Sequence, residues 1–113
     1  NQQLLRGEAL ELYEQALAAG LREPHRHRAQ IQLASSLRTL GRVDEAVAVI
    51  DDVAARHPES LGVAAFRALV RHAAGDPTTA LADLLVAVVA GSTDPDVVRY
   101  RRALTARAAE LSD

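Results

Sequence analysis

The sequence predicts an all-α fold, and three observations support this prediction. Ala, Leu, Glu and Arg, which all favour helix, are scattered through a chain in which 49% of residues are apolar and 3% are aromatic. Gly and Pro are few, at 6 and 4 residues, and no stretch has the composition of a disordered segment. Small and apolar residues also recur at an offset of 34 positions. Together these features indicate repeated helix pairs.

Length and composition limit the class of protein. A chain of 113 residues suits one domain, covering residues 1–113. The absence of Cys excludes disulfides, thiolate metal ligands and Cys nucleophiles. A formal net charge of -2 gives no reason to expect a polyanion as the main ligand. All 13 basic residues other than His are Arg, a usage typical of a GC-rich genome.

No segment reaches the ~20 apolar residues that a membrane helix needs. The longest candidate, residues 81–90, is too short and carries Asp83. No signal peptide is visible, so we expect a cytoplasmic protein that does not bind membranes. The chain begins at Asn1 rather than Met, and we expect that the natural N-terminus lies further upstream.

The recurrence at 34 residues involves five pairs of small or apolar positions. These pairs are Ala34 and Ala68, Gly41 and Gly75, Ala46 and Ala80, Ile50 and Leu84, and Val53 and Ala87. A period of 34 with a helix-turn-helix pattern predicts a helical repeat in which each unit packs on the next. The corner GRVDEA at residues 41–46 becomes GDPTTA in the second copy, so its acidic residues are not repeated. We therefore interpret that stretch as a turn and a helix start, not as an acid/base site.

Residues 33–58 resemble nearly a whole tetratricopeptide repeat. The matching residues are Leu33, Ala34 and Leu37 in the first helix, Gly41 at the turn, Ala46 and Ile50 in the second helix, and Pro58 at the end. Residues 61–91 resemble a second repeat, in which Arg67 and Arg71 stand where the family usually has Leu and an aromatic residue. Residues 9–17 resemble the second helix of a preceding repeat, and the chain as a whole resembles short bacterial proteins of this family, of actinobacterial type.

The resemblance implies a right-handed α–α superhelix of antiparallel helix pairs. With Asp76-Pro77 and Asp94-Pro95 as expected helix starts, we predict helices over residues 2–19, 24–40, 43–56, 60–74, 77–90 and 95–111. The corresponding units are a leading helix of an incomplete repeat over 1–20, repeats over 24–58 and 60–91, and a capping helix over 94–112. Tyr100 is expected to pack against the helix before it.

Charge alternates in sign along the predicted helices. Residues 21–42 hold five Arg and one acid, residues 43–60 one Arg and five acids, and residues 61–75 two Arg and no acid. In the fold of the family the first helix of each pair lines the concave groove, so the groove is expected to be the more positive face. The residues that the resemblance assigns to the groove are Arg28, Ile31, Ser35, Arg38, Leu69, His72, Arg99 and Arg107.

We therefore predict a non-catalytic protein–protein interaction module or scaffold. Arg grips carboxylates in a bidentate manner, so the expected partner is an acidic peptide or a carboxylate terminus. Two alternatives remain open at this point. The Arg residues can instead pair with acids of neighbouring helices or simply be solvated. The module can instead form a homodimer through its incomplete N-terminal end or through an apolar patch at Ile31 and Leu69.

Other residue patterns do not support a chemical site. His25 and His27 diverge by about 200° on a helix, so they lack the spacing of metal ligands, and we expect no metal site. The stretch RYRR at residues 99–102 does not present its three Arg on one face, so nucleic acid is not the expected partner. No phosphate-binding glycine motif or nucleophile motif is present, and we expect neither a cofactor nor an enzyme activity.

Overall fold

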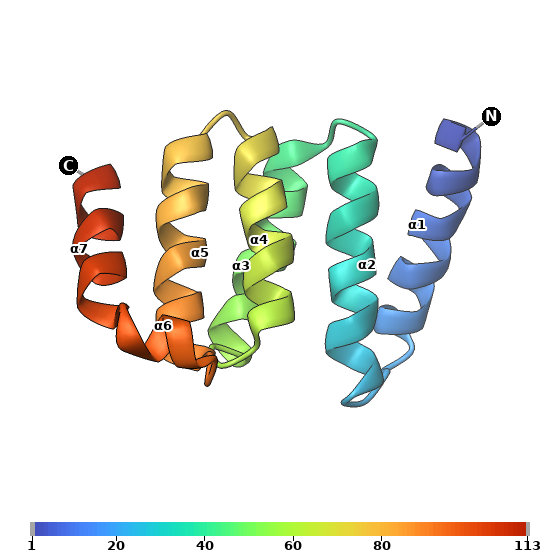
Figure 1. Ribbon diagram of the computed structural model, residues 1–113. Coiled ribbons are helices and arrows are strands. Elements are labelled where there is room, and N and C mark those ends of the chain that lie inside the picture. The colour runs from blue at the N-terminus through green and yellow to red at the C-terminus, as the bar shows by residue number, and fades with distance from the viewer. Residues whose placement is uncertain (1, 113) are drawn as a thin grey trace.

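The computed structural model of the protein describes residues 2–112, with side chains from residue 7 onward. The described chain is all-α (Figure 1). Its helices are α1 (Gln2–Ala18), α2 (His25–Thr39), α3 (Val43–Arg56), α4 (Leu61–Ala73), α5 (Pro77–Gly91), α6 (Pro95–Arg99) and α7 (Arg101–Leu111). The first five agree with the predicted helices to within two residues. No helix in this part of the chain is long and apolar enough to span a bilayer.

The turns after α2 and α4 are built in the same way, which is why the repeat of 34 residues is visible in the sequence. Gly41 and Gly75 adopt φ values of +81° and +85°, a left-handed conformation that glycine reaches without steric cost. The amide of the residue after each glycine donates back over the turn, from Arg42 to the Leu37 carbonyl and from Asp76 to the Arg71 carbonyl. Each glycine thereby ends one helix and reverses the chain direction.

The helices α4, α5 and α6 begin at polar side chains that accept hydrogen bonds from the first turn. Ser60 Oγ accepts from the amide of Val63 at 3.2 Å, which starts α4. Asp76 accepts from the amide of Thr79, and Pro77 follows it in the first turn of α5. Asp94 and Pro95 begin α6 in the same manner. The predicted pairing of an acidic N-cap with a proline is thus confirmed at both places.

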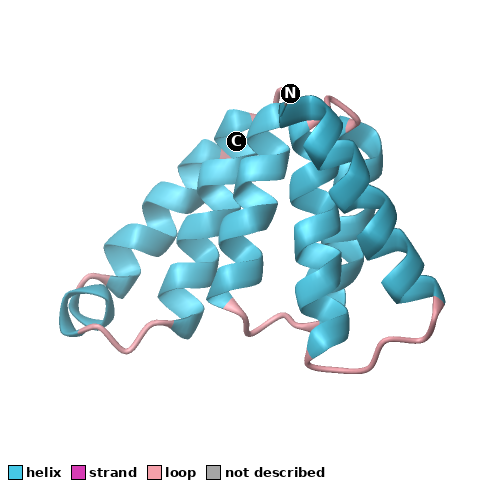
Figure 2. Ribbon diagram, turned by 90° about the vertical axis from the view of Figure 1, so that its right-hand side faces the viewer, coloured by secondary structure: helices cyan, strands magenta, loops and turns pink. Residues whose placement is uncertain are grey.

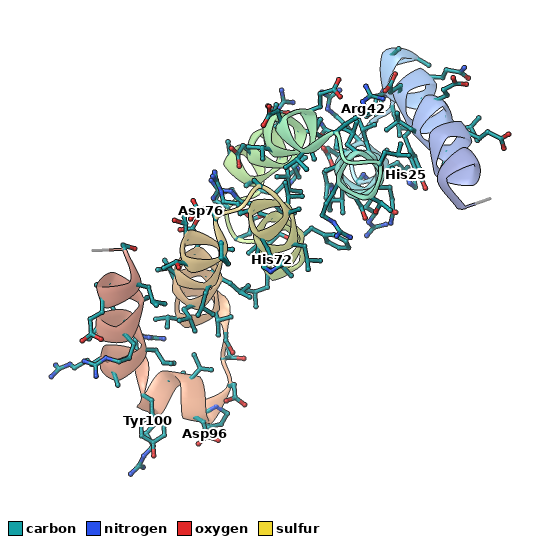
Figure 3. The ribbon with its side chains drawn as sticks, turned by 90° about the horizontal axis from the view of Figure 1, so that it is seen from above. His25, Arg42, His72, Asp76, Asp96 and Tyr100 are labelled. Atoms are coloured by element: carbon teal, nitrogen blue, oxygen red, sulfur yellow. The ribbon has the colours of Figure 1, made fainter. Side chains whose placement is uncertain are left out.

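Each helix packs mainly on its neighbours in the chain, so the stack is elongated, with extents of 44 × 29 × 21 Å. The helix α2 contacts both α1 and α3, α4 contacts both α3 and α5, and α2 and α4 also lie against each other (Figure 3). Figure 2 shows that loops alone join the helices of the described chain. This arrangement is the expected series of antiparallel pairs, with α2 and α4 as the first helix of each pair.

The core lies between α1, α2, α3 and α4. It consists of the buried residues Leu10, Leu33, Ala34, Leu37, Ala46, Ile50 and Val70, with half-buried side chains such as Tyr13 and Phe66 packed around them. Ala34, Ala46 and Ile50 are fully withdrawn from solvent. The alanines therefore stand where helices approach closely, as their small size predicts.

The prediction of one helix over residues 95–111 is wrong in one respect, because the helix is interrupted at Tyr100 and divides into α6 and α7. Tyr100 has a ψ of +20° and its side chain is 54% exposed, so it does not pack against α5 as expected. The apolar stripe that packs instead is on α7, where Ala108 is buried and Leu104 is half-buried. Among the described helices, α7 contacts α5 and α6 and does not reach α4.

Replacing Gly41 with Ala should lower the free energy of unfolding by about 1–2 kcal/mol, because an L side chain is strained at a φ of +81°. Gly62→Ala is the matched control. Gly62 lies inside α4, its nearest neighbour to an added Cβ is Ser60 Oγ at 3.8 Å, and the substitution should leave stability unchanged or raise it by up to about 1 kcal/mol. Urea unfolding followed by circular dichroism measures both; equal effects of the two substitutions would contradict the role of Gly41.

Candidate functional site

The helices α2 and α4 present the larger part of the predicted partner surface. We define the α2–α4 surface as Arg28, Ile31, Ser35, Arg38, Leu69 and His72. The spacing of its α2 members places them along one helix face, and Figure 3 shows His72 on the side of α4 that faces away from α3. Because α2 and α4 pack against each other, residues from the two helices can contact one ligand.

Both helices contribute an apolar side chain to the α2–α4 surface, whereas its Arg residues come from α2 alone. Leu69 on α4 is 49% exposed, whereas Ile31 on α2 is half-buried and also packs against the core. Ser35 is half-buried, and its backbone carbonyl accepts a hydrogen bond from the Thr39 hydroxyl at 3.0 Å. The surface therefore combines the apolar side chains of Ile31 and Leu69 with the Arg residues of α2.

Arg28 and Arg38 supply that charge. Arg28 is exposed and Arg38 half-buried, and no described acidic side chain lies within 4.0 Å of either guanidinium group. Arg42, in the turn between α2 and α3, instead donates two hydrogen bonds to the Glu45 carboxylate at the start of α3. This contact lowers the pKa of the Glu45 carboxyl and raises that of the Arg42 guanidinium. Within the α2–α4 surface, the positive charge that has no described acidic partner therefore lies at Arg28 and Arg38.

The two Arg residues of α4 point away from this surface. Arg67 Nε lies 2.9 Å from Asp51 Oδ1, and Arg71 Nη2 lies 3.1 Å from Asp51 Oδ2. Arg71 Nε lies 4.0 Å from Asp83 on α5 and, although buried, has no hydrogen-bond partner among the described residues. The excess of positive charge counted over residues 61–75 is therefore matched by acids of α3 and α5, and α4 contributes Leu69 and His72 to the α2–α4 surface.

Arg99 and Arg107 lie apart from the α2–α4 surface. Arg99 ends α6, and its Cζ atom lies 5.7 Å from the ring centroid of Tyr100. Arg107 is on α7 and pairs with Glu110, its Nη2 atom 2.9 Å from Oε1. Neither α6 nor α7 contacts α2 or α4, so the structure does not bring these two residues together with the others.

Sequence analysis missed one cluster, which joins Glu23, His27 and His57 at one end of the stack. His27 Nδ1 lies 2.5 Å from Glu23 Oε2, and His57 Nε2 lies 3.5 Å from Glu23 Oε1. The hydrogen bond from His27 lowers the pKa of the Glu23 carboxyl below its ordinary value. His25, the neighbour considered from sequence spacing, is exposed and lies outside the cluster. The available signal was the antiparallel pairing itself, which places the start of α2 beside the end of α3.

Comparison with known proteins supports the same architecture. The family model described as Tetratrico peptide repeat matches residues 5–111. The chain belongs to the tetratricopeptide repeat family. Comparison with curated proteins found no match. Tetratricopeptide repeats are protein–protein interaction modules, and members of the family are generally non-catalytic scaffolds.

A cavity lies between α3, α4 and α5 in the second tetratricopeptide repeat, and Arg67 and Arg71 line it. Its volume is about 290 Å³, and its walls include Ala64, Ala68 and Ala87 together with Arg67 and Arg71. The two Arg side chains lean toward Asp51, and the alanines are too small to fill the remaining space. In the second repeat, Arg67 and Arg71 therefore form ion pairs with Asp51 at the two positions where the sequence resemblance implies apolar packing.

Asp51→Asn should lower the free energy of unfolding by about 1 kcal/mol, since it weakens the partner shared by two half-buried Arg residues. The magnitude is modest because the Asp51 side chain remains 36% exposed to solvent. Salt should reduce the difference from the native chain. The control is Glu110→Gln, which removes an ion pair with 66% and 62% exposed partners and should leave stability unchanged. Urea unfolding at low and high salt measures both, and equal effects would contradict this role of Asp51.

Proposed function

We propose that the α2–α4 surface binds an extended acidic segment of a partner protein. The observation that supports this proposal is the contrast between the Arg residues of the two helices. Arg67 and Arg71 are occupied by acids of neighbouring helices, whereas Arg28 and Arg38 have no described acidic side chain within reach. A ligand carboxylate would supply the missing counter-charge, and guanidinium groups bind carboxylates with two parallel hydrogen bonds.

The spacing of the two Arg residues limits the ligand. Ten residues along α2 separate Arg28 from Arg38, which corresponds to about 15 Å of helix. An extended peptide covers that length in about four to five residues, and its side chains alternate between its two faces. Acidic residues at positions i and i+4 therefore fit the two Arg residues. An apolar residue at i+2 would lie between them on the same face, above Ile31 and Leu69.

Partner binding at this surface is separate from any role of α6 and α7. Arg99 and Arg107 are exposed, but the contacts of α7 place them on another part of the molecule. The proposed site is accordingly smaller than the groove expected from the sequence. It comprises one basic helix, α2, and the exposed apolar face of the next helix of the same type, α4.

Synthetic peptides with the spacing Glu-Ala-Leu-Ala-Glu and their Gln-Ala-Leu-Ala-Gln counterparts provide a direct test. We expect the native chain to bind the Glu peptide more tightly, with an affinity that falls as salt rises. The double substitution Arg28→Glu and Arg38→Glu should reduce that affinity by at least about tenfold, because attraction becomes repulsion at both ends. Fluorescence anisotropy measures the binding, and peptides with free and amidated C-termini separate side-chain from terminal carboxylates.

The matched control is Arg99→Glu combined with Arg107→Glu, which changes net charge equally but leaves α2 untouched. This control should bind the Glu peptide as the native chain does. Equal binding of the Glu and Gln peptides, or an equal loss in the two double variants, would show that the α2–α4 surface is not an acidic-peptide site. Circular dichroism verifies that all variants retain their helices.

Self-association is the second candidate function, and exposed apolar side chains on two helices favour it. Leu12 on α1 is 65% exposed, and Leu69 on α4 is 49% exposed. A second copy of the chain could cover either of these side chains.

In this case size-exclusion chromatography with light scattering should detect a dimer whose fraction rises with concentration. Leu12→Glu or Leu69→Glu should abolish the dimer, according to which helix forms the contact. A monomer at every concentration removes this candidate and leaves the peptide-binding proposal unaffected.

A further inference from the structure

Three potential metal ligands converge where α2 begins and α3 ends. Glu23 lies in the loop before α2, His27 lies in the first turn of α2, and His57 caps the end of α3. One ligand atom from each side chain can be chosen such that all three lie within 4.8 Å of one another. Among the described residues this is the group of His and acidic side chains with metal-binding proximity.

Hydrogen bonds that involve the backbone hold His57 and His27 in place. The amide of His57 donates to the Val53 carbonyl at 2.9 Å, and the His57 carbonyl accepts from the amide of Ser60 at 3.1 Å. The amide of His27 donates to Glu23 Oε2 at 3.4 Å, so the carboxylate also caps the exposed amides that begin α2. Helix ends therefore position both His residues, and contacts of its carboxylate with His27 and His57 hold the Glu23 side chain.

The side chains are oriented toward one point. The imidazole rings of His27 and His57 lie with centroids 4.3 Å apart and planes tilted by 35°. Each ring presents a nitrogen to the carboxylate of Glu23, through Nδ1 of His27 and Nε2 of His57. The His27 and His57 side chains are 21% and 22% exposed and that of Glu23 is 45% exposed, so an ion could enter from solvent.

We propose that Glu23, His27 and His57 form a binding site for a divalent transition-metal ion, with zinc as the best match. Two imidazole nitrogens and one carboxylate oxygen are a donor set that zinc accepts, with water completing a tetrahedral shell. Donor atoms in such a shell lie about 3.3 Å from one another, given metal–ligand bonds of about 2 Å. An ion would require the His27 and Glu23 ligand atoms, now 2.5 Å apart, to separate, while the His57 and Glu23 ligand atoms, 3.5 Å apart, already lie near this distance.

A metal ion at this position would join three separate segments of the chain. Glu23 belongs to the connection from α1, His27 to α2, and His57 to the end of α3. Bound metal would therefore fix the α1–α2 corner against the end of α3 and stabilise the first part of the stack. The competing interpretation is an ordinary ion pair between His27 and Glu23 with His57 packed beside it, which requires no metal.

Isothermal titration of the full chain with ZnCl₂ tests the site without any partner protein. We expect one zinc per chain, and a loss of affinity of at least about tenfold for each of Glu23→Gln, His27→Gln and His57→Gln. His25→Gln and His72→Gln are matched controls, because both residues are exposed and lie outside the cluster. These controls should bind zinc as the native chain does.

A second measurement keeps the test valid if a variant is destabilised. Zinc should raise the thermal unfolding temperature of the native chain and of His25→Gln, but not that of His57→Gln, and EDTA should reverse the rise. Visible absorption of bound Co²⁺ should report direct coordination in the native chain and disappear in the His57→Gln variant.

Several results would overturn the proposal. They are unchanged zinc affinity in all three ligand variants, an equal loss in His25→Gln, and one zinc per two chains with a dimer in light scattering. The last result would indicate a bridge between chains in place of a site within one chain. Since no peptide is present, failure here is distinct from failure of the proposed peptide binding.

Discussion

The whole stack depends on the burial of one stripe of α3 between α2 and α4. Ala46, Ile50 and Val53 lie on the same face of α3 and are fully withdrawn from solvent. Because helices of this size are marginal alone, their stability comes chiefly from packing such apolar faces. The contacts of α3 with α2 and α4 also decide which faces of those two helices remain exposed. The candidate partner surface is what this packing leaves uncovered.

The same constraint explains how charge is distributed. The side of α4 that packs against α3 and α5 carries Arg67 and Arg71 as well as apolar residues such as the buried Val70. Those Arg residues form ion pairs with Asp51 and Asp83, so their charge is already matched within the protein. On α2 the buried face is apolar or neutral, so Arg28 and Arg38 remain toward solvent. Only one of the two helices thus carries usable positive charge.

Helix ends have a further role, because they bring together residues that are distant in the sequence. Antiparallel pairing places the start of α2 beside the end of α3, and Glu23, His27 and His57 meet there. The α2–α4 surface extends along α2 from Arg28 to Arg38, whereas the proposed metal site includes His27 in the first turn of α2. One short helix therefore carries two candidate sites of different chemistry, supported by the same packing against α3.

The sequence alone determined the helices, the turns and the family. Gly41 and Gly75 need a left-handed conformation and Ala46 needs close packing, and such local requirements repeat visibly at 34 residues. It did not reveal the break at Tyr100, since residues 95–111 contain no proline or glycine after Pro95 that would mark it. The break appears only in the tertiary structure, where α7 packs on α5 and Arg99 and Arg107 lie apart from α2.

Tertiary structure also decided which charges are paired and which His residues meet. Spacing along the sequence relates residues of one helix, such as His25 and His27. It does not show that His57, at the end of α3, lies beside His27. The ion pairs of Asp51 with Arg67 and Arg71, and the proximity of His57 to His27, depend on distances between helices, which follow from how the apolar faces pack. Local chemistry therefore specified the elements of this protein, and the packing of α2, α3 and α4 specified its candidate sites.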